Sequence, residues 1–160
     1  MARTELFNRS SQRALPLWLP VVVVVLIVAR IISSRYAVKS PTDLIRWVPI
    51  ENAARLAEMT QKPILYEFSA EWCGPCHQME DEVFRDSKLA ALINEKFIPV
   101  KVVDRQRETG RNPPEVARLE AQYRVGAFPT IVVVHRRNPP ATLVGYQGPA
   151  HFEDFIRGIH

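Results

Sequence analysis

The sequence predicts an α/β domain, with a mixed central sheet and helices on both faces, preceded by one N-terminal transmembrane helix. Two observations lead to this prediction. Residues 14–29 contain no charged side chain, whereas the rest of the chain alternates helical and extended patterns in the order α-β-α-β-α-β-β-α. We therefore divide the chain into an N-terminal tail, anchor and linker over residues 1–40 and one domain over residues 41–160.

The predicted membrane anchor covers about residues 14–32, which include an unbroken run of valines. At about 1.5 Å per residue, a helix of this length spans roughly 28 Å, close to the thickness of a bilayer's hydrocarbon core. Arg30 can extend to the headgroups, and Trp18 and Tyr36 flank the segment where aromatic rings settle. A lipid bilayer is therefore an expected partner, with a cleaved signal peptide and a buried core helix as the alternatives.

The charges around this anchor do not decide its orientation. Three basic residues precede it and three lie at or beyond its end, so the positive-inside count is tied. A short basic tail ahead of a first span usually stays in the cytoplasm. On that ground we expect a single-pass protein of the cytoplasmic (inner) membrane, with its domain on the periplasmic side.

The charge of the domain argues against one class of partner. The whole chain carries a net charge of +4, yet residues 41–160 hold 15 basic and 16 acidic side chains. Phosphate backbones are bound by clustered lysines and arginines, and a domain with this balance has no such excess. We expect no nucleic-acid partner. The two cysteines are also too few for a disulfide-stapled scaffold.

The elements follow from periodicity and from turn residues. The chain connections predict parallel pairing of the early strands and an antiparallel hairpin of the last two, which a short turn joins. In order, we expect a helix after Pro49 within 44–60, a strand over 64–68, a helical segment over 73–95 with a break at Asp86-Ser87, a strand over 97–103, a charged loop over 104–114, a helix over 115–125, strands over 130–135 and 141–146, and an amphipathic helix over 151–159.

Both cysteines lie in the sequence EWCGPCH, between a predicted strand and a predicted helix. The free N–H groups and the dipole at a helix N-terminus stabilise an anion, so the thiol of Cys73 should ionise easily. A spacing of three residues brings Cys76 within one turn of Cys73. Cys73 can then form a mixed disulfide that Cys76 resolves. Pro75 suits the first helical turn, where a missing N–H costs nothing.

Other chemistries compete for the same residues. The string Cys73-x-x-Cys76-His77 also matches the attachment sequence of c-type haem, but the preceding strand and the Gly-Pro centre have no role in a cytochrome. Structural zinc would need four ligands, and the remaining histidines are scattered. A purely structural disulfide would close a small loop with little stabilisation. We expect no metal and no cofactor.

The motif WCGPC, preceded by ILYEFSAE and followed about fifty residues later by FPT, resembles the thioredoxin superfamily. Trp47, Lys62-Pro63 and Val83-Phe84 resemble more closely the branch that contains the C-terminal domain of the thiol:disulfide interchange protein DsbD. The likeness covers about residues 44–158. It implies a thioredoxin-like fold and the activity of a thiol–disulfide oxidoreductase, or protein-disulfide reductase.

The resemblance also implies three catalytic roles. Cys73 would be the nucleophile and Cys76 the resolving thiol. Glu67 matches the buried acid behind the second cysteine, although the family usually has aspartate there. Burial would raise the pKa of this carboxyl, which could then relay the proton of the resolving thiol.

Six further residues match positions that contact the substrate. Trp72 would flank the exposed sulfur of Cys73, and Pro129 matches the family's cis-proline, whose preceding backbone pairs with the substrate chain. Gly145 matches a glycine that lets the backbone approach the site closely. Phe128 is bulkier than the residue usual before this proline and would narrow the choice of substrate. The predicted substrate-binding residues are Trp72, Gly74, Pro75, Phe128, Pro129 and Gly145.

The sequence therefore predicts a membrane-anchored thiol–disulfide oxidoreductase that reduces the disulfides of exported proteins. Gly-Pro between the cysteines resembles the reducing thioredoxins. Because the anchor contains no cysteine, a separate thiol electron donor is needed, either a membrane reductase or a thioredoxin-type protein. The alternative is a redox-inert binding or assembly module on the membrane surface, which would hold an extended peptide near Pro129.

Overall fold

The protein is described from a computed structural model that covers residues 18–35, 42–136 and 138–159. It divides into two compact units, Met1–Val38 and Lys39–His160. In the first unit, helix α1 spans Trp18–Arg35, and the side chains of residues 21–28 are exposed. Residues 14–17 of the predicted anchor lie outside the described part. Among the described residues, no helix combines the length and the apolar character needed to cross a membrane.

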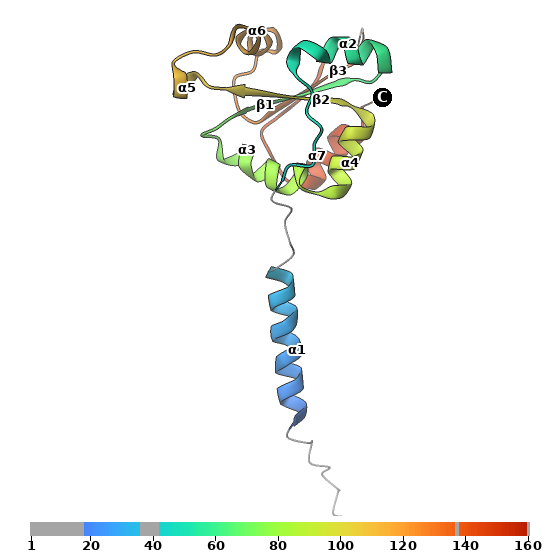
Figure 1. The fold of residues 1–160 in the computed structure, drawn as a ribbon, viewed down its shortest axis with the longest axis vertical. Helices are drawn as coiled ribbons and strands as arrows, with labels where there is room; N and C mark the ends of the chain where they lie inside the picture. Colours follow the sequence, from blue (N-terminus) through green and yellow to red (C-terminus); the bar gives the residue numbers. More distant parts are fainter. Residues whose placement is uncertain (1–17, 36–41, 137, 160) are drawn as a thin grey trace, which may run out of the picture. The chain divides into compact units, whose positions relative to one another are not determined.

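The second unit is built around a four-stranded sheet with the order β2-β1-β3-β4 (Figure 1). Strand β2 is parallel to β1, β3 is antiparallel to β1, and β4 is antiparallel to β3. The elements are α2 (Ile50–Thr60), β1 (Ile64–Ala70), α3 (Gly74–Met79), the π-helical turn η1 (Glu80–Phe84), α4 (Ser87–Lys96), β2 (Ile98–Asp104), α5 (Gln106–Thr109), α6 (Pro114–Tyr123), β3 (Thr130–Val134), β4 (Ala141–Val144) and α7 (Pro149–Arg157).

This architecture confirms the predicted mixed sheet, the parallel first pair and the final hairpin. The break within 73–95 is also confirmed, because the carboxylate of Asp86 accepts the N–H groups of Lys88 and Leu89 at 2.9 Å each and begins α4. One element was not expected: α5 lies within the predicted loop 104–114. Its four residues are too few to show an apolar stripe in the sequence.

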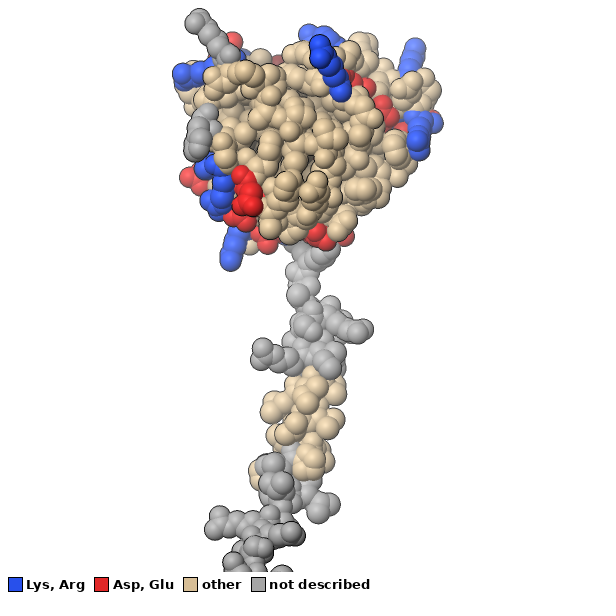
Figure 2. Space-filling view, turned by 180° about the vertical axis from the view of Figure 1, so that it is seen from behind, with Lys and Arg blue, Asp and Glu red and all other residues tan. Residues whose placement is uncertain are grey.

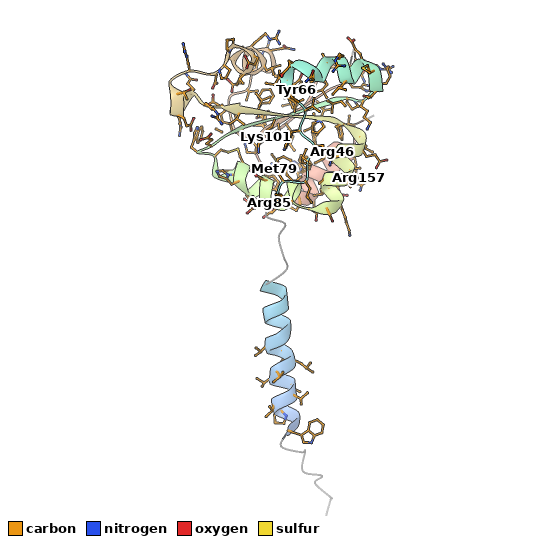
Figure 3. All side chains as sticks on the ribbon, viewed as in Figure 1. Arg46, Tyr66, Met79, Arg85, Lys101 and Arg157 are labelled. Atoms are coloured by element: carbon orange, nitrogen blue, oxygen red, sulfur yellow. A yellow bond between two sulfur atoms is a disulfide. The ribbon has the colours of Figure 1, made fainter. Side chains whose placement is uncertain are left out.

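Helices cover both faces of the sheet (Figure 1). Leu65 and Ile131 point to the side of α3, α4 and α7, whereas Tyr66 and Phe68 point to the side of α2 and α6. Figure 3 shows Met79 and Tyr66 on these opposite sides. All residues of β1 are buried, as expected for a central strand that is covered on both faces. The C-terminal end of β1 therefore leads into α3 from a rigid position.

Charged side chains on the domain are mixed in sign. On the face drawn in Figure 2, basic and acidic residues lie among one another at the margins, and the central area carries neither. This distribution agrees with the near-neutral charge balance that the sequence gives for residues 41–160.

Candidate redox-active site

Cys73 and Cys76 form a disulfide at the junction between the end of β1 and the start of α3, with their Cα atoms 5.3 Å apart. Cys73 is the N-cap residue of α3, and its Sγ accepts the backbone N–H of Cys76 at 3.2 Å. Gly74 and Pro75 form the exposed first turn between them. The N–H of Cys76 is the kind of donor that stabilises a thiolate on Cys73 once the disulfide is reduced.

The peptide bond between Phe128 and Pro129 is cis, as the resemblance implied. Pro129 is buried, and its carbonyl oxygen accepts the N–H of Gly145 at 2.8 Å. Gly145 has a φ of +79°, a backbone conformation that favours glycine. A Cβ at this position would meet no described atom within 4 Å, so the need for glycine comes from the conformation and not from crowding.

The sulfur of Cys73 is not exposed, and this part of the prediction was wrong. Cys73 is only 2% exposed, and the half-buried Phe128 packs against the cluster that Cys73 forms with Cys76 and Ala70. Trp72, the residue before Cys73, is 45% exposed. Its ring meets that of Phe128 edge to face, with centroids 5.9 Å apart. We call Trp72 and Phe128 the aromatic cover.

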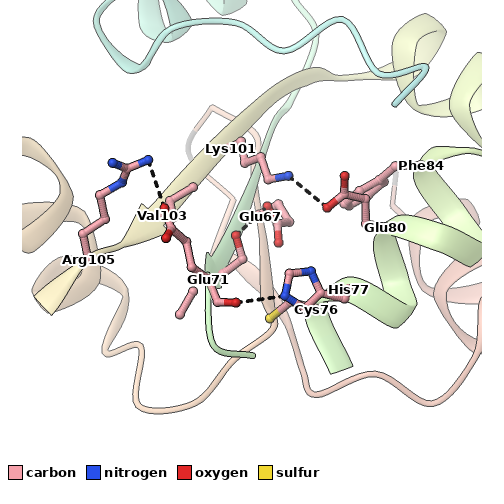
Figure 4. A pocket seen from close by; sticks show the side chains of 11 residues that line it. Glu67, Glu71, Cys76, His77, Glu80, Phe84, Lys101, Val103 and Arg105 are labelled. Carbon is pink, nitrogen blue, oxygen red and sulfur yellow. Dashed lines mark hydrogen bonds and ion pairs between the residues drawn. The ribbon is translucent and has the colours of Figure 1, made fainter. Parts of the chain in front are cut away.

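A cavity of about 180 Å³ lies on the other side of the dithiol and is lined by Glu67, Ser69 and Cys76 among others (Figure 4). Glu67 is 1% exposed, and one of its carboxylate oxygens accepts the hydroxyl of Ser69 at 3.1 Å. Burial raises the pKa of Glu67 to about 7, although the positive charge of Lys101 opposes the shift. A carboxyl that titrates near neutral pH thus shares a cavity with the second cysteine.

Sequence reasoning missed the charged pair that faces this cavity. Lys101 lies opposite Glu67 in the β1–β2 register, and its Nζ lies 3.6 Å from an oxygen of Glu80 (Figure 4). A signal was present, because Lys101 is the one charged residue within the predicted buried strand FIPVKVV. At the rim, a ring nitrogen of His77 lies 2.9 Å from the carbonyl oxygen of Glu71.

The segment predicted as a charged loop also reaches the site. The guanidinium carbon of Arg107, on α5, lies 3.6 Å from the centroid of the Trp72 ring. Next to it, Arg105 pairs with Glu71, with nitrogen and oxygen 3.2 Å apart. No sequence pattern marks an arginine that stacks on a tryptophan thirty-five positions away, and these contacts were therefore not anticipated.

The raised pKa of Glu67 predicts a pH-dependent stability. The carboxyl ionises near its ordinary pKa of 4.5 in the unfolded chain but only near 7 in the folded one, so the free energy of unfolding should fall as pH rises between these values. Glutamine does not titrate. We expect the stability of Glu67→Gln relative to the unsubstituted chain to rise by about 2–3 kcal/mol from pH 5 to pH 8.

Urea unfolding of the oxidised full chain at both pH values measures this difference. Glu71→Gln is a matched control, because Glu71 is exposed. The stability of this variant relative to the unsubstituted chain should differ by no more than about 0.5 kcal/mol between the two pH values. If the free energy of unfolding of Glu67→Gln relative to the unsubstituted chain does not vary with pH, the raised pKa of Glu67 is contradicted.

Comparisons with known proteins agree with this geometry. The family profile described as a thioredoxin-like domain matches residues 50–159. Thioredoxin of Acidithiobacillus ferridurans is 30% identical over 115 residues, which cover 72% of this chain and 95% of that protein. The thiol:disulfide interchange protein DsbD of Vibrio vulnificus (strain YJ016) is 28% identical over 133 residues, which cover 79% of this chain and 21% of that protein.

The solution structure of a thioredoxin from Thermus thermophilus superposes with a TM-score of 0.59 and 27% identity, covering 71% of this chain and 85% of that one. The chain spans only about a fifth of the length of the DsbD proteins that it matches. The profile match extends over most of the domain and includes both cysteines and the cis-proline. The chain therefore belongs to the thioredoxin-like family and is homologous to thioredoxins and to DsbD.

Proposed function

We propose that the protein is a membrane-anchored thiol–disulfide oxidoreductase that reduces the disulfides of exported proteins. The observation that carries the redox part is the Cys73–Cys76 pair at the start of α3, packed against Phe128 and bordering the cavity of Glu67. Homology to a thioredoxin and to a thiol:disulfide interchange protein supports it.

The reaction begins from the reduced chain. The Cys73 thiolate attacks one sulfur of a client disulfide, so that a mixed disulfide forms and the other client sulfur leaves as a thiolate. The Cys76 thiolate then attacks Sγ of Cys73 and closes the internal disulfide, and the client departs with two thiols. Two electrons have passed to the client. The structure contains the oxidised product of this cycle.

Glu67 would serve the second half of the reaction as a proton acceptor. Resolution needs Cys76 as a thiolate, and a carboxylate with a pKa of about 7 is matched to accepting that proton near neutral pH. The cavity shared by Glu67 and Cys76, about 180 Å³, can hold several water molecules at roughly 30 Å³ each. Proton transfer through water therefore fits the geometry.

The client would bind as an extended segment beside the dithiol. Phe128 directly precedes Pro129 and β3, and it packs against the cluster that contains both cysteines. Backbone at such a position can form main-chain hydrogen bonds with an added strand. Val144, on the edge strand β4 opposite Thr130, is 57% exposed and offers apolar contact area next to this segment.

Each turnover leaves the chain oxidised, and the sequence contains only two cysteines. A separate dithiol protein must therefore return two electrons to the Cys73–Cys76 pair. We place the domain on the periplasmic side of the cytoplasmic membrane, held there by the apolar segment 14–32. This proposal is supported by the length of that apolar segment and by the basic residues that precede it.

The cysteines provide a direct test of the redox proposal. Cys73→Ser should abolish the reduction of insulin disulfides by the full chain, because the attacking sulfur is lost. Cys76→Ser should retain the attack and accumulate the mixed disulfide, seen as a client adduct on a non-reducing gel. Full insulin reduction by Cys73→Ser would show that Cys73 is not the attacking sulfur and would contradict the proposed mechanism. Absence of insulin reduction by the unsubstituted chain would contradict the oxidoreductase and support a binding module.

The direction of electron flow is tested by the equilibrium potential of the Cys73–Cys76 couple against glutathione buffers. A reductant should have a potential of about −270 mV, the value typical of thioredoxins. A potential of about −120 mV for this couple, typical of a strong oxidant, would contradict disulfide reduction as the physiological direction.

Topology is tested separately with a reporter at the C-terminus. Alkaline phosphatase, which needs its disulfides to form outside the cytoplasm, should be active when fused after residue 160, whereas a cytoplasmic reporter should be inactive. A fusion lacking residues 1–40 serves as the control and should lose the phosphatase signal. The reverse pattern would place the domain in the cytoplasm.

A further inference from the structure

We propose that Arg107 is a positioning residue for the dithiol: by stacking on Trp72 it holds the aromatic cover over Cys73 and limits the access of thiols and disulfides to its sulfur. The proposal rests on the redox function proposed above. It concerns residues of α5, a segment to which neither the motif nor the catalytic steps assign a role.

A continuous series of contacts connects Arg107 to the disulfide. The Arg107 guanidinium lies 3.6 Å from the centroid of the Trp72 ring, within the range of a cation–π interaction. Trp72 in turn meets Phe128 at an interplanar angle of 73°, and Phe128 packs against the cluster of Ala70, Cys73 and Cys76. In this arrangement Cys73 is 2% exposed.

The backbone that carries Arg107 is held in place from both sides. Before it, Arg105 pairs with Glu71, the neighbour of Trp72, at 3.2 Å. After it, the side chain of Asn112 accepts the N–H of Arg105 at 2.7 Å and donates to Glu120 on α6 at 2.9 Å. Although exposed, α5 thus presents Arg107 to Trp72 from a fixed position.

This arrangement limits access because disulfide exchange requires the attacking thiolate to reach the sulfur. In the oxidised chain, a thiolate must displace the aromatic cover before it can reach Cys73. Space for that displacement exists, because an open groove lined by Trp72, Arg107 and Phe128 among others lies beside the two rings. Stacking by Arg107 favours the closed arrangement and so lowers the fraction of time in which the sulfur is reachable.

The charge of Arg107 predicts the opposite effect, which makes the two roles separable. A cation near Cys73 attracts an approaching thiolate, so if charge alone mattered, removing Arg107 would slow the reaction. If stacking matters, removal frees the aromatic cover and accelerates it. Lysine keeps the charge but lacks the planar group that lies flat on the indole.

The experiment follows the reduction of the oxidised full chain by dithiothreitol and, in parallel, by glutathione. We expect Arg107→Ala to react about two- to fivefold faster with dithiothreitol, and Arg107→Lys to fall between it and the unsubstituted chain. Arg111→Ala, an exposed arginine beyond the same short helix, is the matched control and should leave the rate unchanged. Phe128→Ala removes the ring on the cysteines and should give the largest acceleration.

The equilibrium constant with glutathione provides the second readout. None of the stacked side chains takes part in the exchange, so we expect the stack to form in both the oxidised and the reduced chain and to slow both directions equally. Arg107→Ala should therefore change this constant by less than twofold. The proposal is overturned if dithiothreitol reduces Arg107→Ala no faster than it reduces the unsubstituted chain. It is also overturned if the equilibrium constant with glutathione changes by as large a factor as the rate does. Since Arg107 is exposed, thermal unfolding should show all three arginine variants folded.

This test does not depend on a protein client. Absence of insulin reduction by the unsubstituted chain, together with faster thiol reduction of Arg107→Ala, would refute the proposed function and leave the positioning role intact. Normal insulin reduction with unchanged thiol rates in Arg107→Ala would refute the positioning role alone.

Discussion

The hydrogen bond from the Cys76 N–H to Sγ of Cys73, at 3.2 Å, is the interaction on which the rest of the site depends. It exists because β1 ends at Ala70 and α3 begins at Gly74, so that Cys73 occupies the N-cap of the helix. The central position of β1, buried on both faces, fixes where that helix starts. The Cys76 N–H, which also donates to the carbonyl oxygen of Cys73 at 3.1 Å, is placed to stabilise this sulfur in the disulfide and in the thiolate, and exchange chemistry needs both states.

Burial acts on the two sides of the dithiol in different ways. Towards Glu67, it removes water from a carboxylate and raises its pKa, while Lys101 opposes the shift and is itself held by Glu80 at 3.6 Å. The carboxyl therefore titrates near neutral pH and is not locked in its protonated form. Towards Phe128, burial excludes water from the sulfur of Cys73, and in a less polar environment the hydrogen bond from Cys76 is stronger.

Much of this could be predicted from the sequence, because local rules determine it. The strand before the cysteines, the proline in the first turn of α3 and the Asp86 cap are encoded within a few residues of where they act. The cis bond before Pro129 was implied by resemblance, since no local pattern fixes it. Lys101 could have been singled out as the charged residue of a buried strand, but its position opposite Glu67 and the contact of Arg107 with Trp72 could not be predicted, because they depend on the alignment of β2 with β1. Sequence spacing says nothing about that register.

The near-complete burial of Cys73 creates a conflict that α5 helps to resolve. A shielded disulfide is protected from unspecific thiols, but a reductant must reopen the same site at every turnover. A cover made of packed core residues would open too rarely, whereas one held by an exposed stack contributes only a small free energy and opens readily. Trp72 is 45% exposed and Arg107 lies on the surface, so the cover is attached at its outer edge, where a docking partner can compete for the indole face.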